Sequence, residues 1–241
     1  MTMYYQPRRM MFGGGSMTPA VKGLLIINVG VFIFQQLVGY NFTIIFGLVP
    51  YLVWREFYVW QLFTYQFLHG GILHILFNML ALWMFGCDLE RRWDTEFFLK
   101  YYFVCAVGGA VLNAVFIPNQ TVPSIGASGG IFGILLAYGL IYPNSIIYFY
   151  FVFPIKMKHF VMIIAAITLY SSIVSTQSGI AHLAHLGGMG FGYCYLRWGN
   201  PWPWVKIYLD RVRLARRKQR FHIVTGGKSD NDDDDSKPTL H

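Results

Sequence analysis

The chain has 241 residues, of which 55% are hydrophobic and only 12% are charged, and its formal net charge is +8. Soluble domains carry about 25% charged residues, so this composition excludes an ordinary soluble globular protein and indicates a membrane protein. The three cysteines lie at unrelated spacings in or beside apolar runs, a pattern that fits neither a disulfide framework nor a metal site.

Six apolar segments approach the length that a helix needs to cross a membrane. The first has no small-residue cleavage site after it, so we interpret it as a retained helix and not as a signal peptide. The predicted spans lie at about 22–40, 71–87, 97–117, 128–143, 159–176 and 180–197. The sequence therefore predicts an all-α membrane protein with a bundle of six transmembrane helices.

A long connector, residues 41–69, separates the first two predicted spans. It is rich in aromatic residues, yet Pro50 and the adjacent charged pair Arg55 and Glu56 interrupt it. The segment is too irregular for a span and too apolar for an aqueous loop. Because Trp and Tyr favour the headgroup region, we expect the connector to be partly embedded at the membrane interface.

The second predicted span opens with three polar side chains, His69, His74 and Asn78. His74 and Asn78 are four residues apart, so they share one face of a helix. Two hydrogen-bond donors on one face can form the side-chain part of an oxyanion hole. The alternative is that they only make hydrogen bonds between helices, which is a common role of polar residues in membranes.

A serine between small residues opens the fourth predicted span, in the sequence Gly126-Ala127-Ser128-Gly129. Small neighbours leave room for a substrate carbonyl, and free backbone N–H groups at a helix N-terminus can stabilise an oxyanion. A serine hydroxyl needs a base to become a nucleophile. His185 in the last span is the candidate base, and His182 is the alternative. Serines and glycines also pack membrane helices, so the motif alone leaves a packing role open.

The distribution of positive charge orients the predicted bundle. With six spans, both tails and the connectors 88–96 and 144–158 share one side, which holds every Lys and Arg except Arg55. The positive-inside rule makes that side cytoplasmic, so both termini are expected in the cytoplasm. Ser128 and His185 then begin their spans from the opposite side and lie at a similar depth, as a nucleophile and its base require.

The charge pattern also divides the chain into three parts, which are a tail (1–20), a membrane domain (21–197) and a second tail (198–241). The second tail carries apolar residues at helical spacing among many Lys and Arg residues. Two interpretations remain open, a helix lying on the anionic leaflet and the basic flank of the last span. Since topology explains the basic excess, we do not expect nucleic acid to be a partner.

No carboxylate is placed to complete a catalytic triad. Apart from Glu56, the acidic residues lie on the predicted cytoplasmic side, away from His185. The sequence therefore predicts a Ser–His dyad. Phe132 lies one helical turn after Ser128, on the same face, and can stack on the imidazole ring.

A metal site is a further alternative, because four histidines of the predicted spans could converge: His69, His74, His182 and His185. No span adds a carboxylate or a closely spaced Cys/His group, so we predict no metal and no cofactor. A small-solute transporter is disfavoured, because no charged residue lies deep in a span and no repeat of broken helices is evident.

Taken together, these residues resemble the sequence pattern of the rhomboid intramembrane serine proteases. The similarity covers about residues 22–197 and consists of four elements in the family's order. They are H-x4-H-x3-N (His69, His74, Asn78), E-x-R (Glu90, Arg92), G-x-S-G (Gly126, Ser128, Gly129) and A-H-x-x-G-x-x-x-G (His185, Gly188, Gly192). The resemblance implies a rhomboid-like bundle of six transmembrane helices.

The resemblance also implies a role for each matched residue. Ser128 is expected to be the nucleophile, and His185 the general base and then the general acid. The oxyanion hole is expected to consist of the backbone N–H of Ser128 with the side chains of His74 and Asn78. Phe132 is expected to be an aromatic residue against the catalytic histidine, and His69 is expected to support the connector. Glu90 and Arg92 are expected to tie the cytoplasmic end of the second span. Gly188 and Gly192 are expected to form a face for close packing of the last span on the fourth.

The implied activity is that of an intramembrane serine endopeptidase that cleaves transmembrane or juxtamembrane segments of other membrane proteins. Its partners would be those substrates and the lipid bilayer, in a bacterial-type plasma membrane, with substrates entering beside the fifth span. The alternative is a catalytically inactive rhomboid-like protein that binds membrane-protein clients, although such proteins usually lack the serine or the histidine. One departure concerns the connector, where many members have Trp-Arg and this chain has Trp60 followed by Gln61. This departure leaves the anchoring of the connector open.

Overall fold

The computed structural model describes residues 16–149, 152–174 and 179–199, and these residues are mostly helical. The first helix, α1 (Pro19–Val38), begins at a proline, whose fixed φ suits the first turn of a helix. It ends at Gly39, whose φ of +87° lies in the left-handed region that favours glycine. All but the first two residues of the predicted C-terminal tail (198–241) lie outside the described residues.

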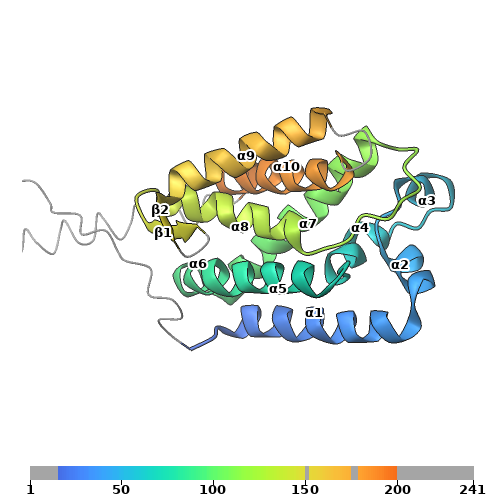
Figure 1. The fold of residues 1–241 in the computed structure, drawn as a ribbon, viewed down its shortest axis with the longest axis horizontal. Helices are drawn as coiled ribbons and strands as arrows, with labels where there is room; N and C mark the ends of the chain where they lie inside the picture. Colours follow the sequence, from blue (N-terminus) through green and yellow to red (C-terminus); the bar gives the residue numbers. More distant parts are fainter. Residues whose placement is uncertain (1–15, 150–151, 175–178, 200–241) are drawn as a thin grey trace, which may run out of the picture. The chain divides into compact units, whose positions relative to one another are not determined.

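The predicted second span consists of three consecutive helical pieces without a break in direction (Figure 1). They are α5 (Ile72–Ala81), a single π-helical turn η2 (Leu82–Gly86) and α6 (Cys87–Trp93). The next helix, α7 (Thr95–Phe116), follows at once. Its N-cap is Asp94, whose carboxylate accepts a hydrogen bond of 2.9 Å from the Phe97 N–H.

The remaining helices are α8 (Ser128–Ile141), α9 (Met157–Val174) and α10 (Gly179–Cys194), the last followed by a π-helical turn, η3 (Tyr195–Gly199). Three segments of the described chain are long and apolar enough to cross a membrane, namely Pro19–Val38, Ile72–Trp93 and Thr95–Phe116. The helices Ser128–Ile141 and Met157–Ile173 are also apolar but shorter. The chain is therefore a membrane protein, and the number of six spans stays a prediction.

The helices form a bundle in which α8 and α7 lie between two outer groups (Figure 1). On one side α1 lies along α5, and on the other α9 and α10 lie side by side. The most extensive helix contacts are those of α10 with α7 and α8. The close packing of α10 on α8 matters because these two helices carry His185 and Ser128.

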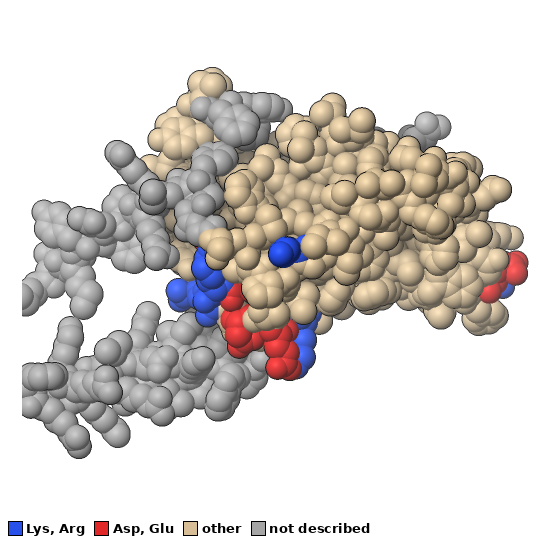
Figure 2. Space-filling model, turned by 90° about the horizontal axis from the view of Figure 1, so that it is seen from below, with Lys and Arg blue, Asp and Glu red and all other residues tan. Residues whose placement is uncertain are grey.

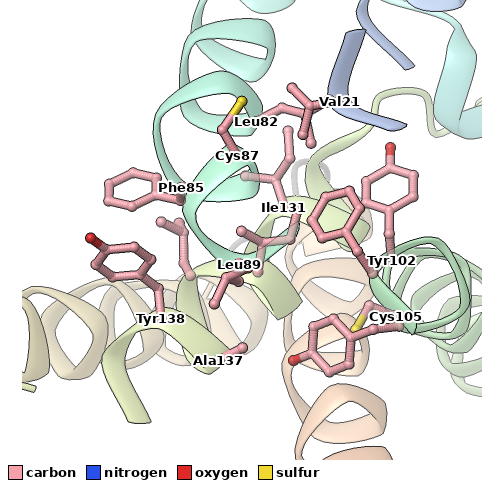
Figure 3. Close-up of a cluster of buried hydrophobic side chains, with 14 of the residues drawn as sticks. Val21, Leu82, Phe85, Cys87, Leu89, Tyr102, Cys105, Ile131, Ala137 and Tyr138 are labelled. Carbon is pink, nitrogen blue, oxygen red and sulfur yellow. The ribbon is translucent and has the colours of Figure 1, made fainter. Parts of the chain in front are cut away.

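The main hydrophobic core lies where α1, η2, α6, α7 and α8 meet. Its fully buried side chains include Val21 of α1, Leu82 of η2 and Tyr102 of α7. Figure 3 shows these side chains in one cluster with Ile131 of α8, with the helices packed around them. Burying an aliphatic or aromatic side chain of this size stabilises a fold by about 1.5–3 kcal/mol.

The connector folds into short helices at one end of the bundle. These are α2 (Tyr40–Phe46), α3 (Pro50–Arg55), α4 (Gln61–Thr64) and a single 3₁₀ turn, η1 (Tyr65–Phe67). Trp54 and Trp60 remain exposed, while their indole N–H groups donate to the backbone oxygens of Ala114 and Ile45. An exposed apolar ring with a satisfied N–H suits a membrane interface, and the embedding of the connector stays a prediction.

The all-α expectation misses a short β-hairpin between α8 and α9. Strand β1 (Ile146–Phe149) pairs antiparallel with β2 (Phe153–Lys156), and Ile147 lies opposite Ile155. The strands are rich in β-branched and aromatic residues, which favour a pleated backbone. Each strand has only four residues, so no alternation of polar and apolar positions was long enough to reveal it.

The charged residues gather near the ends of the bundle. Figure 2 shows basic and acidic residues together toward each of the two ends of the bundle, with a broad uncharged surface between the two groups. Arg55 ends α3, whereas α6 contains Asp88, Glu90, Arg91 and Arg92, and these two helices lie at opposite ends of the bundle (Figure 1). An uncharged belt between charged ends fits a protein that spans a bilayer.

Candidate active site

The side chains of Ser128 and His185 meet between α8 and α10. Ser128 Oγ lies 2.5 Å from His185 Nε2, across 57 residues of sequence. Ser128 is the first residue of α8, and the first hydrogen bond of that helix runs from the Ile131 N–H to the Ala127 oxygen. The N–H groups of Ser128 and Gly129 therefore have no partner within their own helix. The pair has the geometry of a nucleophile with its base, beside free backbone donors.

Glycines allow the helix backbones to touch at this point. A Cβ on Gly188 of α10 would overlap the backbone oxygen of Gly129 in α8. A Cβ on Gly109 of α7 would likewise overlap the backbone oxygen of Ala184. These contacts fix α10 against α7 and α8 at the level of Ser128. A larger residue at Gly109 or Gly188 would push His185 away from Ser128.

An aromatic ring holds the imidazole from the side. The rings of Phe132 and His185 are stacked, with centroids 4.2 Å apart and planes at 7°. Phe132 follows Ser128 by one helical turn, so α8 provides both the hydroxyl and the ring that packs on its partner. Stacking restricts the rotation of the imidazole. Phe132 can therefore orient the His185 ring, as a carboxylate does in a catalytic triad.

The His74 ring faces the loop that precedes Ser128. Its Nδ1 accepts a hydrogen bond of 3.2 Å from the Gly70 N–H, so the proton of the neutral ring lies on Nε2. That Nε2 lies against Gly126, where an added Cβ would be only 2.8 Å away. Gly126 has φ +126°, which disfavours any other residue. His74 thus presents an N–H donor next to the loop that carries Ser128.

Asn78 lies on the same face of α5, one turn after His74, and is buried. One of its amide N–H groups donates to the His74 backbone oxygen at 2.8 Å. A second N–H of the same amide remains for another acceptor. The sequence prediction that His74 and Asn78 share a helix face is consistent with this arrangement.

The loop before Ser128 is held by Tyr65, a residue that the sequence did not single out. The Tyr65 backbone oxygen accepts a hydrogen bond of 3.0 Å from the Gly126 N–H. Its hydroxyl donates to the Ala106 oxygen of α7 at 2.7 Å and lies close to Gly129. Tyr65 thus joins the connector to α7 and to both sides of the serine. In sequence it is one aromatic residue among many in the connector, and no spacing distinguishes it.

The remaining predicted residues occupy supporting positions. The backbone N–H of the fully buried His69 donates to the side chain of Gln35 in α1, which ties the end of the connector to that helix. Glu90 accepts hydrogen bonds from the Ala20 and Val21 N–H groups, at 2.9 and 3.0 Å, and so caps the start of α1. Its carboxylate also accepts a hydrogen bond from Thr95.

Arg92 and Gly192 contact neighbours that the sequence did not identify. Arg92 lies over the ring of Tyr142, 5.5 Å from its centroid, so Glu90 and Arg92 tie α6 to two different helix ends. Gly192 faces α7, because a Cβ there would meet the Tyr101 hydroxyl, whereas a Cβ on Gly188 would overlap Gly129 of the fourth predicted span. Gly188 and Gly192 are one turn apart on α10, and α10 packs against both α7 and α8. Successive turns of α10 can therefore face different neighbouring helices.

Of the four histidines considered for a metal site, His185 makes the hydrogen bond to Ser128. The ring centroid of His182 lies 6.1 Å from that of His185, and the His69 ring lies 5.1 Å from that of His74. Within the described residues, no group of three or more His, Cys, Asp or Glu side chains could hold a metal ion. The geometry therefore assigns the contact with Ser128 to His185.

The sequence was compared with known families and proteins. Residues 56–199, more than half of the chain, match the family model described as the Rhomboid domain. The chain belongs to the rhomboid family. This match covers the described helices from α4 to η3 and includes the pair Ser128 and His185.

Relatives of this rhomboid chain include plant and bacterial proteins. RHOMBOID-like protein 12, mitochondrial, of Arabidopsis thaliana is 28% identical over 214 residues, covering 80% of this chain and 60% of the relative. Rhomboid protease GluP of Bacillus subtilis is 45% identical over 76 residues, covering 32% of this chain and 14% of the relative. Rhomboid protease GlpG of Klebsiella pneumoniae is 36% identical over 74 residues, covering 31% of this chain and 27% of the relative. This chain thus spans less than two thirds of the length of each relative.

Proposed function

We propose that this rhomboid is an intramembrane serine endopeptidase that cleaves transmembrane or juxtamembrane segments of other membrane proteins. The observation that carries the proposal is the distance of 2.5 Å between Ser128 Oγ and His185 Nε2, on two apolar helices. Polar groups that meet at membrane depth are functional candidates, because they are costly to bury there. Two relatives named rhomboid proteases support the same reaction class.

In the proposed reaction, neutral His185 accepts the Ser128 proton at Nε2 while Oγ attacks the carbonyl carbon of the scissile peptide bond. The resulting imidazolium then donates this proton to the leaving amine, and the acyl group stays on Ser128. Water attacks the acyl-enzyme with His185 as the base, which releases the carboxylate product and restores Ser128. Phe132 keeps the ring oriented throughout, since it stacks on the imidazole.

The negative charge of the tetrahedral intermediate needs donors in fixed positions. The backbone N–H of Ser128 at the start of α8 is the first, and His74 Nε2–H is the second. Asn78 adds its free amide N–H from the next turn of α5. Each donor of this kind typically contributes about 3 kcal/mol of transition-state stabilisation, and the donors act without reorganising solvent.

We further propose that the bundle has six spans and that its more basic side, with both termini, is cytoplasmic. Ser128 then lies near the outer face, and substrate helices enter beside α9, which packs on α10 and α8 and exposes large apolar side chains along much of its length. The relatives include bacterial proteases and a mitochondrial protein, so the bacterial-type plasma membrane stays a prediction.

Purified protein reconstituted in lipid vesicles with a panel of single-span substrate proteins tests the proposed function. Panel members should carry small residues within a segment that unwinds easily. We expect cleavage of at least one substrate inside or next to its membrane segment, detected by mass spectrometry of both fragments. Stable association with intact substrates and no cleavage of any of them would instead indicate a client-binding protein without protease activity.

A further inference from the structure

Gln61 occupies the connector position where the sequence departs from the family pattern, and it is completely buried. Its side-chain oxygen accepts a hydrogen bond of 2.9 Å from the Val49 N–H. Its amide nitrogen donates to the backbone oxygens of Ile44 and Ile45, at 2.8 and 3.2 Å. The Gln61 side chain therefore satisfies donors and acceptors of the segment 44–49 at once.

The segment that Gln61 holds is itself paired with the loop before the serine. Leu48 and Ser124 exchange two backbone hydrogen bonds, of 2.9 Å from the Leu48 N–H and 2.8 Å from the Ser124 N–H. Gly47 lies so close to Pro123 and Ile125 that an added Cβ would be 3.1 and 3.0 Å from their side chains. Leu48 and its neighbour Val49 are both buried, so this contact excludes water.

Ser128 follows Ser124 by four residues, and Gly126 between them is also held in place. The Gly126 N–H donates to the Tyr65 backbone oxygen, and Tyr65 follows Gln61 by one helical turn. The loop is thus attached to the connector on both sides of Ile125. Gln61 and Tyr65 together determine where the loop enters α8.

We propose that Gln61 is a positioning residue for Ser128, acting through Val49, Leu48 and Ser124. This inference rests on the proposed function, because it concerns the reactivity of the nucleophile. Gln61 lies at the start of α4 and the serine at the start of α8, and a continuous path of hydrogen-bonded backbone joins them. A displacement of about 1 Å in a reacting group can reduce a rate by about 100-fold, so a loosened loop has a large effect.

The chemistry of the contact requires an acceptor at position 61. Val49 N–H donates to the Gln61 oxygen in a buried place, and a buried N–H without a partner destabilises the structure that contains it. Arginine has only donors, so it can bond to the oxygens of Ile44 and Ile45 but leaves Val49 unpaired. We therefore expect that Gln61→Arg, which restores the Trp-Arg pattern, impairs this protein instead of improving it.

The test compares Gln61→Met and Gln61→Arg with the matched control Gln66→Met. Gln66 is equally buried in the same connector, but within the described part of the chain its amide nitrogen donates to Phe63 alone, in the adjacent turn. For wild type and variants in vesicles, three quantities are measured. They are the rate of covalent labelling by a fluorophosphonate probe, kcat and KM for a cleaved substrate, and hydrogen exchange at the amides of Val49 and Ser124.

We expect both Gln61 variants to label about 10-fold more slowly or worse, with kcat reduced and KM changed less than about 2-fold. Exchange should accelerate at Val49 and also at Ser124, whereas Gln66→Met should match the wild type. Unchanged kcat and labelling in folded Gln61 variants would overturn the inference, and so would wild-type protection at Ser124. If the wild type neither cleaves nor labels, the proposed function fails, and the exchange at Ser124 alone then decides whether Gln61 positions the loop.

Discussion

Alanine in place of either Ser128 or His185 is expected to reduce substrate cleavage by roughly 10⁴-fold or more, because each member of a nucleophile–base pair depends on the other. Ser128 Oγ and His185 Nε2 are 2.5 Å apart, so removal of either group leaves no route for the proton. Initial rates of cleavage in vesicles measure the effect. His182→Ala is the matched control, since His182 lies one turn away on the same helix.

The double variant Ser128→Ala/His185→Ala makes this prediction stricter. If the two residues act as one unit, the double variant should be no slower than either single variant. The control His182→Ala should retain most of the wild-type rate. Losses that multiply in the double variant, or a loss in His182→Ala as large as that in His185→Ala, would contradict the assignment of the dyad.

Gly188→Ala is expected to destabilise the bundle by about 3 kcal/mol and to abolish most of the activity. The added methyl group would overlap the backbone oxygen of Gly129, and a backbone atom cannot move aside as a flexible side chain can. Since α10 carries His185 and α8 carries Ser128, the shift that relieves the overlap also separates the pair. Thermal unfolding in detergent micelles and fluorophosphonate labelling measure the two effects.

Gly190→Ala is the matched control on the same helix. A Cβ at Gly190 has no neighbour within 4 Å, so the substitution adds no overlap. Alanine also favours a helix over glycine by roughly 0.5–1 kcal/mol. Gly190→Ala should therefore be as stable as the wild type or slightly more stable. Equal stability and labelling of Gly188→Ala and the wild type would show that the close contact of α8 and α10 is not needed.

The sequence was most informative where chemistry restricts the residue type. A serine between small residues, a histidine in a later apolar run and a basic excess on one side each follow from simple requirements of reactivity and membrane topology. Ser128 and His185 could be paired in advance because alternate spans enter the membrane from the same side. Phe132 followed from helical spacing alone, and the stacked rings agree with that expectation.

The contacts that hold the site were less predictable, because they use backbone groups. Tyr65 acts through its backbone oxygen and hydroxyl, and Gln61 through an amide that reaches a segment 12 or more residues earlier. Neither interaction leaves a periodic pattern in the sequence. The contact of Gly192 with Tyr101 of α7 was not predicted for a related reason, since the crossing of α10 over two helices depends on tertiary packing.

The measurement that tests the central claim most directly is the site of covalent reaction with a fluorophosphonate. Wild-type protein and His185→Ala in lipid vesicles are treated with the probe, digested, and mapped by mass spectrometry. The proposed dyad predicts one adduct, on Ser128, in the wild type and almost none in His185→Ala. An adduct on another serine, such as Ser124 or Ser172, or labelling of Ser128 that does not depend on His185, would contradict it.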